Sequence, residues 1–337
     1  MARKPTLLDL LDKYEPPLAK AFIAAIQEIT SKVQIGRVAE ALERGDINRA
    51  IEALYLDRAA FERFEETIRE AYLEGGRVTV DDLPVIKQPD GSRFVIRFNA
   101  RNLRAEQWLR EHSSELVTRV IAEQRDSIRS HLQTGLQDSR NPRSVALDIV
   151  GRINKATGRR EGGVVGLSAP QERAVTNARQ ELSQGDYGAY LQRTKRDKRF
   201  DRLIARAERE ERQLTQAEIG KIINRYSDRL LKLRGDTIGR TEALASLHAA
   251  QYEALMQLVD TGKVTANQVR RVWDSAGDLR VRRDHAIADG QSVGLFEDFK
   301  VGGRSMRFPG DPRGGPDQVI NCRCVARTRI DFLANVR

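Results

Sequence analysis

The chain has 337 residues, with 58 Lys or Arg against 48 Asp or Glu, so its formal net charge is +10. Charged residues reach 31% and aromatic residues only 6%, which argues against one large compact enzyme core and for two or three domains. No stretch approaches the roughly eighteen apolar residues that cross a bilayer, so no membrane contact is expected. The two cysteines indicate a reducing compartment and no disulfide framework.

Residues 1–76 predict a small N-terminal helical bundle with no sign of chemistry. Apolar residues recur at helical spacing after Pro16-Pro17, where the first helix is expected to open. Gly75-Gly76 is expected to end the last helix of this bundle. Residues 77–102 then predict a linker and a short strand or extended arm, whose alternating apolar residues are Phe94, Ile96 and Phe98.

Residues 103–185 predict a middle helical region built on one long helix. Its apolar stripe runs over about Leu103–Gln137. Two histidines, His112 and His131, lie near that stripe. We interpret them as ordinary packing residues, because no cysteine or carboxylate cluster accompanies them.

Residues 186–262 predict basic helices and hold the most basic run of the chain. The first half of that run has a local excess of cations, since its acidic residues fall mainly in the second half. One interpretation is a solvated helix face with internal ion pairs, and the other is contact with the phosphate backbone of DNA. The residues that would bind nucleic acid are Lys195, Arg196, Lys198 and Arg199.

A capping box from Thr215 to Glu218 predicts the start of a further helix in the same region. We expect this helix to be interrupted around Gly235-Asp236. An alanine-rich helix is expected to follow over residues 238–259. Its small side chains allow close packing, either within this chain or against a partner.

Residues 263–337 predict a small α+β module, because the tight turns of such a module require the Asp, Gly and Pro that are dense here. The clearest strand of the chain is expected from Ile320 onward, where residues alternate between an apolar and a polar face. Cys322 and Cys324 would then point together toward the apolar side.

These paired thiols admit three interpretations. They are packed core thiols, or they bind zinc with His285 as a third ligand, or one of them is a nucleophile with His285 as its base. A disulfide between residues two apart in a strand would be strained. Catalysis requires thiols in an exposed electropositive cleft, whereas the strand pattern turns them inward. No cofactor other than such a zinc ion is expected.

An ordered set of residues across the last third of the chain resembles the C-terminal domain of phage Mu F-like head morphogenesis (minor capsid) proteins. Arg-Thr-Glu comes first, on a helix, and is followed by Trp-Asp, Arg-Asp-His, Asp-Gly, Pro-Gly-Asp-Pro and Asn-Cys-Arg-Cys. Order and spacing together carry the resemblance. The motif residues are Arg240, Thr241, Glu242, Trp273, Asp278, His285, Asp289, Gly290, Asn321, Cys322 and Cys324.

This resemblance implies a non-enzymatic virion component in the capsid interior near the portal, present in the host cytoplasm during assembly. Its partners would be the portal protein and capsid or scaffold proteins, and it would act in procapsid assembly, with DNA packaging or ejection as further roles. Two alternatives stay open: a nucleic-acid-binding internal virion protein, and a cryptic hydrolase or transferase that uses His285 with Cys322 and Cys324. The expected fold is mainly α, an elongated multi-helix architecture with a small C-terminal α+β module.

Overall fold

The computed structural model describes residues 5–83, 96–262 and 264–331. In these residues the protein is mostly helical, at 65%, with twelve α-helices and small antiparallel sheets in the C-terminal region, which confirms the expected fold class. None of the described helices is both long enough and apolar enough to cross a membrane.

The helices differ widely in length, from short connecting turns to one of 45 residues. They are α1 (Leu7–Lys32), α2 (Ile35–Glu43), α3 (Ile47–Glu52), α4 (Glu62–Asp82), α5 (Leu103–Gln137), α6 (Pro142–Val150), α7 (Ala169–Gln184), α8 (Tyr187–Leu191), α9 (Asp201–Arg209), α10 (Gln216–Asp260), α11 (Arg283–Ile287) and α12 (Pro316–Val319). The strands are β1 (Arg152–Ile153), β2 (Arg160–Glu161), β3 (Val269–Asp274), β4 (Ser292–Gly294), β5 (Phe299–Val301), β6 (Arg304–Met306) and β7 (Val325–Ile330).

The chain divides into two compact units, each assembled from segments that lie far apart in the sequence. Unit 1 comprises residues 1–20, 64–114 and 236–337, and unit 2 comprises residues 21–63 and 115–235. The division into five consecutive segments, made from the sequence, remains a prediction. Each unit takes residues from several of those segments, and α10 supplies residues to both.

Helix α1 begins before the expected position at Pro16-Pro17, which instead lie inside the helix. A reciprocal cap explains the earlier start. The backbone N–H and the hydroxyl of Thr6 both donate to Asp9 Oδ2 at 2.7 Å, and the Asp9 N–H donates to Thr6 Oγ1 at 3.3 Å. This box has Asp where Glu or Gln is usual, so its signal in the sequence is weaker.

Helix α4 does not end at Gly75-Gly76, as expected, but continues to Asp82. The two glycines serve close packing, since a Cβ on Gly76 would collide with the Phe98 ring and one on Gly75 would lie 3.1 Å from Leu247 Cδ2. Residue 94 of the expected strand lies outside the described residues, and residues 96–98 form no strand.

Helix α10 is continuous through Gly235-Asp236, where an interruption was expected. A glycine inside a helix costs only about 1 kcal/mol, which tertiary packing outweighs. A Cβ on nearby Gly239 would lie 2.6 Å from the carbonyl oxygen of Glu15, so this face of α10 contacts α1 backbone directly. The alanines that follow are buried within the chain and form part of its own core: Ala243, Ala245, Ala249, Ala250 and Ala254.

Unit 2 contains a buried carboxylate surrounded by arginines. The side chain of Asp148 in α6 is 2% exposed and accepts hydrogen bonds from three of them. Arg140 is one donor, while Arg152 Nη1 and Arg179 Nη2 lie 3.0 Å and 2.9 Å from Asp148 Oδ1. Burial alone would raise the pKa of Asp148, but the charges of Arg179, Arg140 and Arg152 outweigh it and hold that pKa below its ordinary value.

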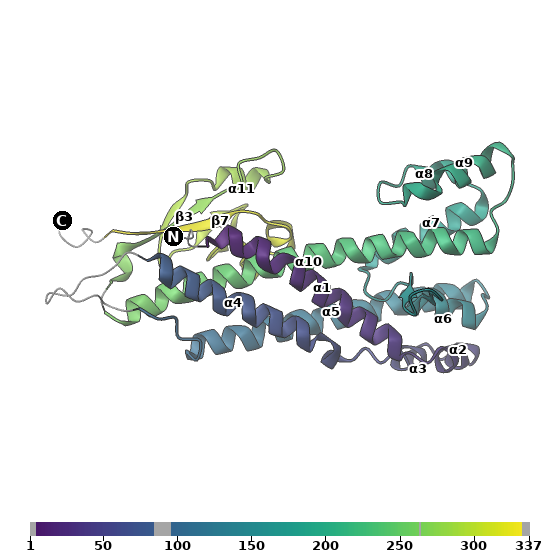
Figure 1. Ribbon diagram of the computed structural model, residues 1–337, viewed down its shortest axis with the longest axis horizontal. Coiled ribbons are helices and arrows are strands. Elements are labelled where there is room, and N and C mark those ends of the chain that lie inside the picture. Colours follow the sequence, from purple (N-terminus) through teal and green to yellow (C-terminus); the bar gives the residue numbers. More distant parts are fainter. Residues whose placement is uncertain (1–4, 84–95, 263, 332–337) are drawn as a thin grey trace. The chain divides into compact units, whose positions relative to one another are not determined.

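The C-terminal part of unit 1 contains a three-stranded antiparallel sheet in the order β4-β3-β7, together with a β5-β6 hairpin. Strands β3 and β7 run side by side next to the C-terminal half of α10 (Figure 1), with Trp273 opposite Ala326. On the outer edge of β7, the backbone N–H of Ala326 donates to Nε2 of His248 in α10 at 3.1 Å. The helix therefore covers part of an edge that would otherwise be open to another strand.

Strand β7 begins at Val325 rather than at the expected Ile320. Asn321 adopts a left-handed conformation, with φ of 56°, which an extended strand does not allow. Ile320 is consequently 41% exposed, whereas Cys322 and Cys324 still both turn into the interior. The alternation of buried and less buried residues thus begins at Cys322 and continues into β7, and Asn321 excludes Ile320 from it.

Candidate functional site: a buried Cys-Cys-His cluster

Three side chains converge in the C-terminal part of unit 1: Cys322, Cys324 and His285. His285 comes from α11, and the cysteines come from the irregular segment between α12 and β7. Nδ1 of His285 lies 3.3 Å from Sγ of Cys324 and 3.5 Å from Sγ of Cys322. The three atoms lie within 4.8 Å of one another, and each residue is at most 2% exposed.

The cysteine segment is anchored to its neighbours by backbone hydrogen bonds. The N–H of Asn321 donates to Oγ1 of Thr241 in α10 at 3.2 Å, and the Thr241 hydroxyl donates to the Thr237 carbonyl at 2.8 Å. From the other side, the Arg282 guanidinium donates to the Ile320 carbonyl. The segment that carries the thiols is thereby tied both to the long helix and to the start of α11.

The orientation of His285 is set by Gln318 of α12. Gln318 Nε2 donates to Oδ2 of Asp284 at 2.9 Å, which leaves its Oε1 facing His285 Nε2 at 3.0 Å. This hydrogen-bond network assigns the ring proton to Nε2, because Oε1 can only accept. The lone pair of Nδ1 is therefore directed at the two sulfur atoms.

The surroundings of the cluster are closely packed. The fully buried Trp273 of β3 meets the His285 ring edge-on, with 5.4 Å between centroids and an interplanar angle of 86°. Behind Gln318, a Cβ on Gly302 would lie 2.5 Å from both Gln318 Nε2 and Asp284 Oδ2. Only a glycine leaves room at this position for the amide–carboxylate pair.

The two thiols are electrostatically unequal. The hydrogen bond from Cys322 lowers the pKa of Cys324 below its ordinary value, although burial opposes the change. The interaction with Cys324 and the loss of solvation raise the pKa of Cys322 well above its ordinary value. One thiolate is therefore favoured next to the imidazole, and the second costs more unless a cation joins the cluster.

The chemistry open to this arrangement is narrower than the residue types suggest. A thiolate beside an imidazole is the pairing of a cysteine nucleophile, but burial of all three groups denies access to a substrate. A metal ion needs no such access once bound, and two sulfurs with one nitrogen are ligands that zinc accepts. Burial therefore argues against a cysteine nucleophile, whereas packed thiols and a zinc site are both compatible with it.

The remaining motif residues of the C-terminal part brace the loops around the cluster. Asp278 accepts from both terminal nitrogens of Arg323 at 2.5 Å and 2.6 Å, and these hydrogen bonds hold the pKa of Asp278 well below its ordinary value. Asp289 Oδ1 accepts from the Ser275 N–H at 2.7 Å. The Gly290 N–H donates to the Trp273 carbonyl at 2.8 Å, at a φ of 75° that favours glycine.

The motif residues of α10 make contacts within unit 1 rather than with the cluster. Arg240 contacts both carboxylate oxygens of Glu15 in α1, at 2.7 Å and 3.0 Å. Glu242 is buried and its Oε2 lies 2.7 Å from Nε2 of His112, whose ring stacks on Trp108 with 4.4 Å between centroids. Of the Arg-Thr-Glu triplet, only Thr241 reaches the cysteine segment.

Some polar residues of these units were missed by sequence reasoning. His112 and His131 do pack in helices, but each has a carboxylate partner that the sequence analysis did not expect, Glu242 and Glu172 respectively. His248 and Gln318 were not singled out at all. For Gln318 no sequence signal was available, because an isolated glutamine in a polar turn is ordinary.

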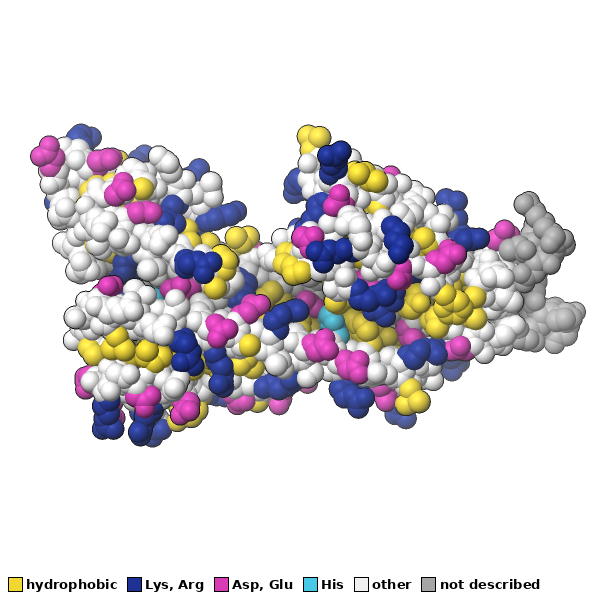
Figure 2. Space-filling view, turned by 180° about the vertical axis from the view of Figure 1, so that it is seen from behind, with side chains coloured by type: hydrophobic (Ala, Val, Ile, Leu, Met, Phe, Trp, Pro, Cys, Tyr) yellow, Lys and Arg dark blue, Asp and Glu magenta, His cyan; other side chains and the backbone are white. Residues whose placement is uncertain are grey.

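The residues expected to bind nucleic acid lie in unit 2, around the turn that precedes α9. Lys195 and Lys198 are exposed. Arg196 instead pairs with both oxygens of Asp201 at 2.9 Å, and Arg199 pairs with Asp197. On the face drawn in Figure 2, cationic and anionic side chains are interspersed. The local excess of positive charge is therefore smaller than the sequence suggests.

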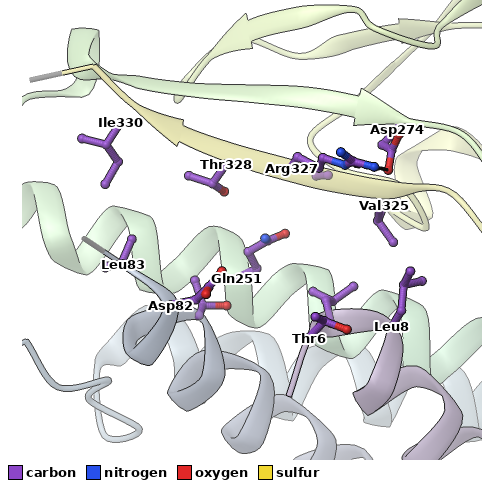
Figure 3. A pocket seen from close by; sticks show the side chains of 13 residues that line it. Thr6, Leu8, Asp82, Leu83, Gln251, Asp274, Val325, Arg327, Thr328 and Ile330 are labelled. Atoms are coloured by element: carbon purple, nitrogen blue, oxygen red, sulfur yellow. Dashed lines mark hydrogen bonds and ion pairs between the residues drawn. The ribbon is translucent and has the colours of Figure 1, made fainter. Parts of the chain in front are cut away.

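A cavity of about 610 Å³ lies in unit 1 between β7 and the helices beneath it (Figure 3). Thr6 and Leu8 approach it at the start of α1, Leu83 just after α4 and Gln251 from α10, opposite Thr328 and Ile330 of β7. Arg327 of the same strand points away and binds Asp274 through its Nε at 2.7 Å. Among the described residues that line this cavity, none forms a metal-ligand cluster comparable to the Cys-Cys-His group.

Comparison with known proteins adds no relative to this description: no family model, no curated protein and no solved structure matches the chain. The resemblance to Mu F-like proteins therefore rests on the motif residues themselves.

Proposed function

We propose that this chain is a non-enzymatic minor capsid protein that associates with the portal during assembly of a phage head. The proposal rests on the order of the motif residues from Arg240 to Cys324, which resembles that of Mu F-like proteins. In this chain the C-terminal motif residues mostly contact one another or the adjacent loops, as Asn321 contacts Thr241. A motif that serves as a framework supports a structural role over a catalytic one.

In this role the protein acts in the host cytoplasm during procapsid assembly and remains inside the mature virion near the portal. Its partners are the portal protein and the capsid or scaffold proteins around it. The alanine-rich part of α10 is not the contact surface, because its alanines are already buried within the chain.

Co-purification with the portal protein encoded in the same genome tests this function. We expect the two proteins to elute together at low and at high salt, because a shape-based contact does not depend on screening alone. A portal protein from an unrelated phage is the control. Loss of the complex with the cognate portal at every salt concentration, together with unchanged particle assembly in the absence of this chain, would contradict the proposal.

DNA contact is the second candidate function, and it is favoured by the exposed Lys195 and Lys198 in a chain of net charge +10. It accounts for the basic composition but not for the motif. The alternative of a hydrolase or transferase at Cys322 or Cys324 has less support, since both thiols are at most 2% exposed.

A further inference from the structure

We infer that Cys322, Cys324 and His285 form a binding site for one thiophilic divalent cation, with zinc as the ion that the donor set fits. The inference is independent of the proposed role in head assembly. It rests on distances, on the direction of one lone pair, on the chemistry of the donors and on the packing behind them.

The distances match those between ligands of a tetrahedral zinc ion. Zinc–sulfur bonds of about 2.3 Å and zinc–nitrogen bonds of about 2.0 Å place the nitrogen roughly 3.5 Å from each sulfur. Nδ1 of His285 lies 3.3 Å and 3.5 Å from the two sulfur atoms. A cation can therefore be seated by small shifts of side chains, without moving the backbone.

The lone pair needed for ligation is already in place. Because Gln318 Oε1 accepts from Nε2 of His285, Nδ1 carries no proton and faces the sulfurs. An outer carbonyl or carboxylate that fixes the ring of a ligating histidine is the usual arrangement at zinc sites. Here Gln318 and Asp284 supply that outer support.

The donor types select the metal. Two thiolates and an imidazole are soft or borderline ligands, which suit zinc and exclude magnesium and calcium, whose ligands are oxygens. Among the described residues, no carboxylate joins the group. A water molecule would complete four-coordination, and ion uptake would release to solvent any proton that the thiols still carry.

Packed thiols alone explain the arrangement less well. One lone pair on Nδ1 can accept from only one of the two S–H groups, so the second sulfur gains nothing from the histidine. A purely apolar core would instead place aliphatic side chains around Trp273. Coordination employs all three groups at once, and it ties α11 to the segment that leads into β7.

The site is tested first by the metal content of the full-length chain, reduced, loaded with zinc chloride and then desalted. We expect about one equivalent of zinc, and X-ray absorption showing two sulfur neighbours and one imidazole nitrogen. Cys322→Ser and His285→Gln should each lose the zinc, while His131→Gln, a buried histidine of unit 2, should retain it. Less than about a tenth of an equivalent in the wild-type chain overturns the inference.

Cobalt substitution keeps the test decisive if the cysteine variants fail to fold. Cobalt(II) added to the wild-type chain should give a thiolate charge-transfer band and intense tetrahedral ligand-field bands, both removed by zinc. A spectrum typical of octahedral oxygen and nitrogen ligation would mean surface binding only, and would overturn the assignment.

Two adjacent glycines provide a matched pair for the outer support. Gly302 and Gly303 both have left-handed φ angles, 55° and 76°, but a Cβ meets Gln318 and Asp284 at Gly302 and nothing within 4 Å at Gly303. Gly302→Ala should weaken zinc affinity about 10- to 100-fold, as loss of outer-shell support does. Gly303→Ala should leave it unchanged, and equal effects of the two variants would contradict the positioning role of Gln318.

Discussion

Two buried polar centres of this chain differ in whether their polar atoms have partners of opposite charge within the chain. In unit 2, Asp148 is surrounded by the guanidinium groups of Arg140, Arg152 and Arg179, so every oxygen of the carboxylate has a donor of opposite charge. In unit 1, Cys322, Cys324 and His285 place three potential lone-pair donors within 4.8 Å of one another. The first centre is complete within the chain, and the second is not.

This difference separates a structural ion cluster from a candidate ligand site. A buried carboxylate satisfied by its own chain has nothing left to offer a ligand. Sulfur and nitrogen atoms that converge on one point, by contrast, have lone pairs that can bind a cation. Burial and the presence of titratable groups are common to both centres, so neither property alone identifies a site.

The largest effect is expected at the complete centre. Asp148→Ala leaves three arginines without their shared partner, and we expect the free energy of unfolding of unit 2 to fall by about 3–5 kcal/mol. Denaturant titration with amide hydrogen exchange measures the loss. Zinc content should not change. If unit 2 is barely affected, the carboxylate is not the stabilising element of this cluster.

A smaller effect is expected at His248, the neutral histidine that covers the edge of β7. Desolvation lowers its pKa from 6.5 to about 4 in the folded chain. Between these pH values the unfolded chain binds a proton that the folded chain does not, so stability is lost as the pH falls. The contribution amounts to about 3 kcal/mol, complete above pH 6.5 and lost by about pH 4.

His248→Gln is the matched variant, since a glutamine oxygen can still accept from the Ala326 N–H. The difference in unfolding free energy between wild type and variant should therefore shrink or reverse from pH 7 to pH 4.5. Parallel pH profiles would show that His248 does not titrate with folding.

The smallest effect on stability is expected at the exposed Lys195 and Lys198. Replacing both with Glu should change the unfolding free energy by no more than about 0.5 kcal/mol, as at other exposed positions. If they contact DNA, the salt dependence of binding should lose a slope of about 0.9 for each phosphate contact removed. An unchanged slope would mean that these lysines do not contact phosphates and serve only solubility.

The parts of the fold that sequence could predict are those specified locally. The capping box from Thr215 to Glu218 and the long apolar stripe of α5 carry their signals within a few turns of helix, and both appear as expected. Gly75-Gly76 and Gly235-Asp236 were misread as helix ends. Gly75-Gly76 allows close packing against Leu247 and Phe98, and the packing of α10 tolerates Gly235-Asp236 inside the helix. Both reasons depend on residues that lie far away in the sequence.

The candidate site shows the same division. Sequence brought Cys322, Cys324 and His285 together as a hypothesis, and the structure places them in contact. Both thiols are buried, as the alternation predicted, but the left-handed Asn321 excludes Ile320 from that face. Gln318, which decides the state of His285, carried no signal, since its role depends on a partner 33 residues away.

The interleaved order of the segments has a consequence for biogenesis. Residues 21–63 and 115–235 are synthesised before residues 236–337, so every part of unit 2 exists while unit 1 still lacks its last segment. We expect unit 2 to fold first during translation, with residues 64–114 waiting unprotected. A released chain ending at residue 235 should accordingly resist protease in unit 2 and be cut in that waiting segment. Cys322 and Cys324 belong to this last segment, so both thiols of the cluster are made only after every part of unit 2.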